Sequence, residues 1–157
     1  MQGIIDSFVK EKEVAVVGVS RSGKQWGNMM ASALAKKGYV VYRVNPNADE
    51  IRGEKCWRTV GDLPKSVSSV ILTVAPASAE QVVKDCAQAG IKRVWFHKGA
   101  GGSGSASDAA IAECASRGIE EVHGVCPLMF YPPTGAHRLH FVLKKAFRTL
   151  PKGFGPN

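Results

Sequence analysis

The residues with the clearest potential for chemistry lie in one short stretch, Gly18-Val-Ser-Arg-Ser-Gly-Lys-Gln25. It follows an apolar run and precedes a helical pattern, which is the context in which a glycine-rich turn holds a phosphate. Glycine lets the backbone bend tightly and approach an anion, while the helix amino terminus offers free N–H groups and partial positive charge. The stretch therefore predicts an anion site built from Gly18, Ser20, Arg21, Gly23 and Lys24.

A P-loop is one interpretation of this turn. The spacing Gly-x-x-x-x-Gly-Lys fits, but Gln25 occupies the position at which a Ser or Thr hydroxyl binds magnesium. No later strand ends in the aspartate that would hold the metal. The pattern therefore argues against nucleoside triphosphate hydrolysis.

A dinucleotide fingerprint is the second interpretation. Gly18 and Gly23 match Gly-x-Gly-x-x-Gly, but Ser20 replaces the middle glycine. An NAD site also has an acid at the end of the second strand, whereas Asp49 and Glu50 come several residues after that end. NAD is thus disfavoured, and an NAD(P)-binding oxidoreductase or redox-sensing domain that uses the same turn remains the alternative.

Two other groupings could carry chemistry. Cys126 follows a strand three residues after His123, but residues three apart on a strand point to opposite faces. His137 and His140 have helical spacing without a third metal ligand nearby. We therefore expect no catalytic residue, no metal site and no enzyme activity of this chain alone.

The elements around the turn alternate regularly. Apolar, β-branched runs predict strands at 14–19, 39–44, 69–74, 93–97 and 119–125. Helical patterns bounded by glycine or proline predict helices at 3–12, 25–37, 78–89, 107–118 and 137–150. Strict alternation predicts a single-domain α/β fold, a doubly wound, Rossmann-like, five-stranded parallel sheet with helices on both faces.

In such a sheet the carboxyl ends of all strands lie at one edge, where ligands bind. The loops expected there span residues 20–24, 45–46, 75–78, 98–104 and 126–135. The anion-binding turn is the first of them.

Composition limits the class of protein. The chain has 157 residues, 45% of them hydrophobic, and one domain of this length buries about 70% of its unfolded surface without needing disulfides or metal. No apolar run approaches the ~20 residues of a membrane span, and the amino terminus lacks signal-peptide order. The four cysteines form no Cys-x-x-Cys pair and are expected to be reduced. We therefore expect a cytoplasmic protein.

The net charge of +8 predicts an anionic partner, but much of the excess is at the carboxyl end. Residues 137–157 contain five basic and no acidic side chains. If residues 137–150 form a helix, its apolar side chains lie mainly on one face and its basic side chains on the opposite face. We expect this segment to pack as the last helix on a domain of residues 1–136, followed by a frayed tail at 151–157. Nucleic acid is accordingly not expected as a partner.

The sequence resembles the small stand-alone CoA-binding proteins, whose Rossmann-like fold is similar to the CoA-binding domain of the succinyl-CoA synthetase α subunit. The resemblance covers residues 5–130 and rests on an ordered set of short motifs: Val16-Val-Gly-Val-Ser20, Lys24, Val44-Asn-Pro46, Ile51-Arg-Gly53, Asp62-Leu-Pro64, Thr73-Val-Ala-Pro76, Gly90-Ile-Lys-Arg-Val-Trp95 and Val125-Cys-Pro127.

The resemblance implies a path for coenzyme A or an acyl-CoA. The diphosphate would lie over Gly18, Ser20, Arg21 and Lys24, and the adenosine half would pass Asn45 and Pro46. The pantetheine arm would cross the ends of the third and fourth strands, at Val74, Pro76, Lys98 and Gly99. The chain departs from the family at His97-Lys98, where a Gln commonly precedes the Gly.

The chemistry of CoA suits these residues. Its diphosphate and 3′-phosphate are strongly anionic, and both Arg and Lys bind phosphate well. A strand end without an acid, at Asn45-Pro46, avoids repelling the extra phosphate that NAD lacks. We therefore expect a CoA-binding protein that works as a homodimer or with a partner enzyme.

Overall fold

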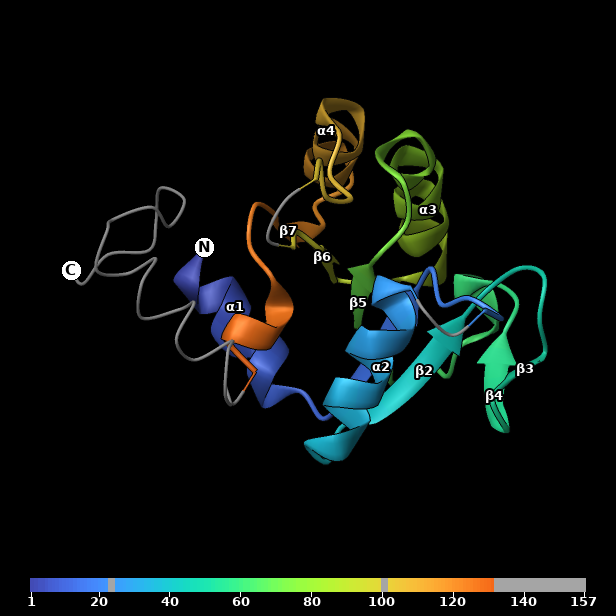
Figure 1. Cartoon of the computed structure of the whole chain (residues 1–157). Helices are drawn as coiled ribbons and strands as arrows, with labels where there is room; N and C mark the ends of the chain where they lie inside the picture. The colour runs from blue at the N-terminus through green and yellow to red at the C-terminus, as the bar shows by residue number, and fades with distance from the viewer. Residues whose placement is uncertain (23–24, 100–101, 132–157) are drawn as a thin grey trace.

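The computed structural model describes residues 1–22, 25–99 and 102–131 (Figure 1). The predicted helix at 137–150 and tail at 151–157 lie outside these residues. Gly23 and Lys24 of the anion-binding turn also lie outside them.

One sheet organises the described chain. Its strands are β1 (Glu13–Val17), β2 (Val40–Val44), β3 (Glu50–Ile51), β4 (Glu54–Trp57), β5 (Ser69–Leu72), β6 (Arg93–Phe96) and β7 (Glu120–Val122). The order across the sheet is β3-β4-β2-β1-β5-β6-β7, and all neighbours are parallel except β3 and β4. The central strand β1 therefore has β2 on one side and β5 on the other, with Val16 opposite both Arg43 and Ile71.

The predicted strand count of five is wrong, because the sheet has seven strands in the part of the chain that the structure describes. The five expected strands are present as β1, β2, β5, β6 and β7, and the additional pair is a short antiparallel hairpin, β3–β4. Its turn residues Arg52 and Gly53 both have positive φ, 57° and 76°, as a two-residue type I′ turn requires. Strands this short and polar leave no apolar run in the sequence.

Within the described residues, four helices cover the two faces of the sheet: α1 (Gln2–Lys10), α2 (Trp26–Lys36), α3 (Pro76–Ala89) and α4 (Asp108–Ser116). Alternate residues along the strands face opposite ways, so Val16 and Ile71 pack in a core with α1 and α2. Leu72 and Val94 pack in a second core with α3 and α4. Figure 1 shows the same division, with α1 and α2 on one side of the strands and α3 and α4 on the other.

Helix ends follow the sequence signals. Gly90 ends α3 in the left-handed conformation, and Ser107 caps α4 by accepting a hydrogen bond from the Ala110 N–H at 3.2 Å. The helix α3 begins at Pro76, two residues earlier than predicted, since proline is well suited to the first helical position. Within the described residues, every helix is too short or too polar to cross a bilayer.

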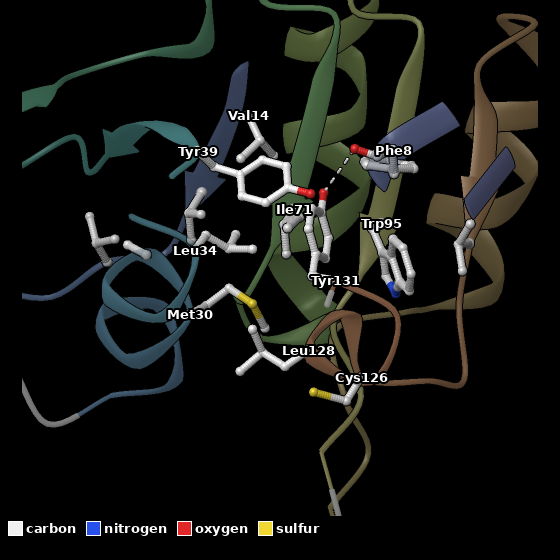
Figure 2. Close-up of a cluster of buried hydrophobic side chains, with 14 of the residues drawn as sticks. Phe8, Val14, Met30, Leu34, Tyr39, Ile71, Trp95, Cys126, Leu128 and Tyr131 are labelled. Atoms are coloured by element: carbon white, nitrogen blue, oxygen red, sulfur yellow. Dashed lines mark hydrogen bonds between the residues drawn. The ribbon is translucent and has the colours of Figure 1, made fainter. Parts of the chain in front are cut away.

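Aromatic residues close the core beneath α1. Tyr131 lies edge-on to Tyr39 with ring centroids 4.9 Å apart, and Phe8 lies edge-on to Trp95 at 5.2 Å (Figure 2). The Tyr131 hydroxyl donates to the Phe8 carbonyl at 3.4 Å, and the Tyr39 hydroxyl donates to the Val9 carbonyl at 2.8 Å. This cluster ties the segment after β7 to the amino-terminal helix.

The amino ends of β5, β6 and β7 carry a polar network. Glu11 accepts hydrogen bonds from Ser68 and Ser69 and pairs with Arg93, which also lies 3.6 Å from Glu120. These charges satisfy one another at that edge. The opposite edge, where the parallel strands end, is the one that sequence reasoning assigned to a ligand.

Candidate functional site

The turn after β1 is held in place by very close backbone packing. A Cβ on Gly18, whose φ is +101°, would lie 2.7 Å from Thr73 Oγ1, and a Cβ on Gly27 would lie 2.5 Å from the Gly18 carbonyl oxygen. The Thr73 hydroxyl and N–H both donate to the Val17 carbonyl at 2.8 Å. The end of β1, the end of β5 and the start of α2 therefore meet at positions where only glycine fits.

Asn28 fixes the conformation of the turn. Its Oδ1 accepts from the Ser20 N–H at 2.8 Å and its Nδ2 donates to the Ser20 carbonyl at 2.9 Å. The Ser20 hydroxyl lies 3.0 Å from the Ser22 hydroxyl and accepts from the Ser22 N–H at 3.3 Å. Ser20 thus shapes the turn through bonds within the protein.

Asn45 connects the loop after β2 to the same turn. Its Nδ2 donates to the Val19 carbonyl at 2.5 Å, and its Oδ1 accepts from the Asn47 N–H at 2.8 Å. Pro46 is exposed beside it. The predicted site residues Gly18, Ser20 and Asn45 therefore belong to one hydrogen-bonded edge.

The nearest carboxylate after β2 is neutralised. Arg58 donates to both oxygens of Asp49, at 2.6 and 2.8 Å, and this hydrogen-bonded guanidinium holds the pKa of Asp49 below its usual value. Asp49 is thus paired with a cation on the surface.

Two helices begin at this edge with free amino termini. Neither α2 nor α3 has a side-chain cap or an acidic residue in its first turn among the described residues. In contrast, α4 has both the Ser107 cap and Asp108. Pro76 has no N–H, and the Asn28 and Ser78 N–H groups donate to the carbonyls of Gln25 and Ala75. Among the described residues, the N–H groups of Trp26, Gly27 and Ala77 have no hydrogen-bond partner, and the helix dipoles favour an anion beside them.

The remaining predicted residues lie at the same edge. Arg21 is exposed, with no hydrogen bond or ion pair to another described residue. Val74 packs against the α3 face and is followed by Pro76 at the start of α3. The Lys98 ammonium donates to the Gly102 carbonyl, which closes its own loop.

His97 and Trp26 join the loop after β6 to the start of α2. The His97 ring is buried and lies 5.4 Å, centroid to centroid, from the Trp26 indole. A Cβ on Gly99 would lie 3.5 Å from His97 Cε1 and 3.7 Å from the indole. Gly99 therefore faces both rings.

The histidine and the cysteine after β7 lie in different surroundings. His123 Nδ1 lies 2.8 Å from Glu121 Oε2, and Cys126 packs in the core beside Leu128 (Figure 2). Burial also raises the pKa of Cys86 and of Cys114, the latter to about 12. Raised thiol pKa values keep these two cysteines protonated and poorly reactive.

Four residues that build this edge were not among the predicted site residues: Trp26, Gly27, Asn28 and Thr73, the last of which the sequence offered only as part of a family motif. In a dinucleotide fingerprint, the third glycine lets the helix pack closely on the strand. The spacing assigns this role to Gly23, but in the structure Gly27 makes the close contact. For Asn28 the sequence offers one signal, an asparagine in the first turn of a helix that follows a glycine-rich turn.

The comparisons with known proteins agree on the family. A family model described as a CoA binding domain matches residues 12–132. Over 83 residues, 52% of this chain, the sequence is 39% identical to acetate–CoA ligase (ADP-forming) II of Archaeoglobus fulgidus. It is 29% identical over 92 residues to the alpha subunit of ADP-forming acetate–CoA ligase II of Pyrococcus furiosus. The matches span 12% and 20% of those two proteins.

Solved structures give the same picture. A conserved hypothetical protein from Pyrococcus furiosus is 36% identical, with a TM-score of 0.67 over 73% of this chain and 95% of that one. A dinucleotide-forming acetyl-coenzyme A synthetase 1 from Ca. Korarchaeum cryptofilum, in complex with phosphate and ADP, is 26% identical with a TM-score of 0.65. That match covers 75% of this chain and 26% of the synthetase.

Proposed function

This chain belongs to the CoA-binding domain family, and from that membership we propose that it binds coenzyme A or an acyl-CoA at the carboxyl edge of its sheet. The observation that carries the proposal is the family match over residues 12–132, which includes every described loop at that edge. From β1 the chain adds β2 on one side and later β5 on the other, so the direction in which strands are added reverses at β1. Open α/β sheets bind their ligands at such a point.

The diphosphate lies over the turn at Gly18, Ser20, Arg21, Gly23 and Lys24. The uncapped start of α2 supports this placement, because its N–H groups and dipole favour an anion. The close packing of Gly27 on Gly18 and Thr73 supports it further, since it brings the start of α2 against the ends of β1 and β5, where the turn lies.

The adenosine half passes Asn45 and Pro46. The pairing of Asp49 with Arg58 supports CoA over NAD, because the guanidinium offsets the charge of the first carboxylate after β2 and so lessens its repulsion of a 3′-phosphate. The pantetheine arm then runs past Val74 and Pro76 toward Lys98 and Gly99.

The chain acts as a binding module that works with a partner enzyme. The matched relatives named as CoA ligases are five to eight times longer than the matched segment, as the covered shares of 20% and 12% indicate. Burial of Cys126 in the core supports a binding role without thiol catalysis. Incubation with acetyl-CoA should therefore release no free thiol above the buffer rate, and release that Cys126→Ser abolishes would contradict this assignment.

Thermal unfolding tests the ligand. CoA at millimolar concentration should raise the melting temperature, because a ligand at 100 times its Kd stabilises the folded state by about 2.7 kcal/mol. NAD at the same concentration should leave the melting temperature unchanged. Equal shifts with the two ligands would contradict selectivity for CoA and favour the NAD(P)-binding alternative. No shift with CoA would refute CoA binding.

A further inference from the structure

His97 carries an unpaired polar atom in a buried position. Its side chain is only 5% exposed, and Nε2 is buried with no hydrogen-bond partner in the described chain. Buried polar atoms in folded proteins are paired in the large majority of cases, so an unpaired one calls for a partner from outside the protein.

The imidazole is held on a rigid part of the edge. His97 directly follows β6, and its N–H donates to the Leu72 carbonyl at 2.9 Å while its carbonyl accepts from the Ser105 N–H at 2.9 Å. The ring therefore projects from a fixed backbone at the carboxyl ends of β5 and β6.

Gly99 and Trp26 border this ring. Gly99 has no side chain, and the space that a Cβ would fill there is bounded by His97 Cε1 at 3.5 Å and the indole of Trp26 at 3.7 Å. Cε1 is the ring carbon between Nδ1 and Nε2, so Gly99 and Trp26 lie beside the part of the ring that carries its nitrogens. Trp26 is 57% exposed, and exposed side chains change rotamer within nanoseconds.

We propose that His97 is a specificity-determining residue that hydrogen-bonds through Nε2 to an amide of the pantetheine arm, with the Trp26 indole packed along that arm. This assignment rests on the proposed function and identifies the part of the ligand that the loop after β6 recognises. Trp26 links the two parts of this path, because it follows the turn after β1 in the chain and its indole lies 5.4 Å from the His97 ring.

The chemistry of the site favours an amide over a phosphate. Burial lowers the pKa of His97, so the ring is neutral at pH 7 and offers one donor or one acceptor without charge. An uncharged amide matches that single neutral group, whereas a phosphate is better served by Arg21 and the helix amino termini. The flat, exposed face of Trp26 suits the methylene groups of the arm.

Calorimetric titration with two ligands tests the proposal. Adenosine 3′,5′-bisphosphate has the phosphates and base of CoA but no pantetheine arm. For His97→Phe, CoA affinity should fall about tenfold or more, while affinity for adenosine 3′,5′-bisphosphate stays within about twofold. His97→Gln, which keeps a donor and an acceptor, should recover most of the CoA affinity. Equal affinity of His97→Phe and wild type for CoA, or equal losses for both ligands, would overturn the proposal.

A measurement on the unaltered protein covers the case in which His97→Phe does not fold. In protein labelled with 15N at histidine, the Nε2 resonance of His97 should shift on adding CoA and stay in place on adding adenosine 3′,5′-bisphosphate. An unchanged Nε2 resonance in CoA-saturated protein would overturn the proposal. Failure of the wild type to bind either ligand would instead refute the proposed function, so the two failures are distinguishable.

Discussion

Gly27 approaches Gly18 so closely that the two residues exclude any side chain between them, since a Cβ on Gly27 would lie 2.5 Å from the Gly18 carbonyl oxygen. The same Cβ would lie 2.7 Å from Thr73 Oγ1. The contact therefore sets how far the start of α2 stands from the ends of β1 and β5, and with it the width of the candidate diphosphate site.

Gly27→Ala should accordingly destabilise the protein, although alanine is the better helix former. Overpacking of this kind costs about 1–3 kcal/mol. Gly3→Ala is the matched control, because Gly3 is also helical and its added Cβ would meet nothing within 4 Å, so this change should stabilise by up to ~1 kcal/mol. Urea unfolding measures both, and a Gly27→Ala protein as stable as Gly3→Ala would contradict the packing argument.

Asn28 holds both backbone polar groups of Ser20, so its side chain is a structural determinant of the turn. Asn28→Ala should reduce stability by about 1–3 kcal/mol, because it leaves part-buried backbone groups without partners. CoA binding should weaken as well, since the turn loses its fixed shape.

Asn47→Ala is the control for that variant. Asn47 is exposed and takes part in the loop through its backbone N–H, which any residue but proline retains. Its unfolding free energy should stay within about 0.5 kcal/mol of wild type. Similar losses for the two variants would mean that the bonds between Asn28 and Ser20 contribute nothing specific.

The central strands, the helix ends and the glycine-rich turn can be predicted from the sequence. The runs around Val16 and Ile71 are continuously apolar, so the central strands were readable, and Gly90 and Ser107 marked helix ends by their conformational preferences. The glycine-rich turn was readable because its chemistry is local. Each of these signals resides in a few consecutive residues.

What was missed depends on contacts between distant segments. Gly27 is required by Thr73, 46 positions later, and Asn28 is defined by the fold of the turn that it closes. The hairpin β3–β4 has strands of two and four residues, too short to show a period, and Arg52 in its turn is a rare non-glycine residue at positive φ. The unpaired state of His97 Nε2 follows from burial, which no sequence pattern reports.

Arg21 is the exposed cation best placed to act on a ligand without supporting the fold. Arg21→Ala should leave the unfolding free energy unchanged and weaken CoA binding by about 10- to 150-fold, the equivalent of one lost charge-assisted hydrogen bond of about 1.5–3 kcal/mol. The loss should shrink at high salt, because screening weakens exposed ion pairs.

Arg117→Ala removes one positive charge at the opposite edge, where Arg117 pairs with Glu113 at 2.9 Å on the surface of α4. Exposed pairs of this type contribute about 0.3–0.5 kcal/mol, so the variant should bind CoA like the wild type. If both variants weaken binding equally, the effect of Arg21 is one of net charge and not of position.

Burial of His97 should make stability depend on pH in a definite direction. Desolvation lowers the pKa of His97 in the folded state below the unfolded value of 6.5, so between these two pKa values the unfolded state binds more protons. Stability should therefore fall as pH decreases below about 6.5 and level off below the folded-state pKa, with each unit of lowering worth about 1.4 kcal/mol. His97→Gln lacks this contribution, while all other titrating groups are shared with the wild type. The free energy of unfolding of both proteins can be measured with urea from pH 5 to pH 8. The difference between wild type and His97→Gln should shift against the wild type as the pH falls. Parallel plots of unfolding free energy against pH would show that His97 does not titrate as a buried group.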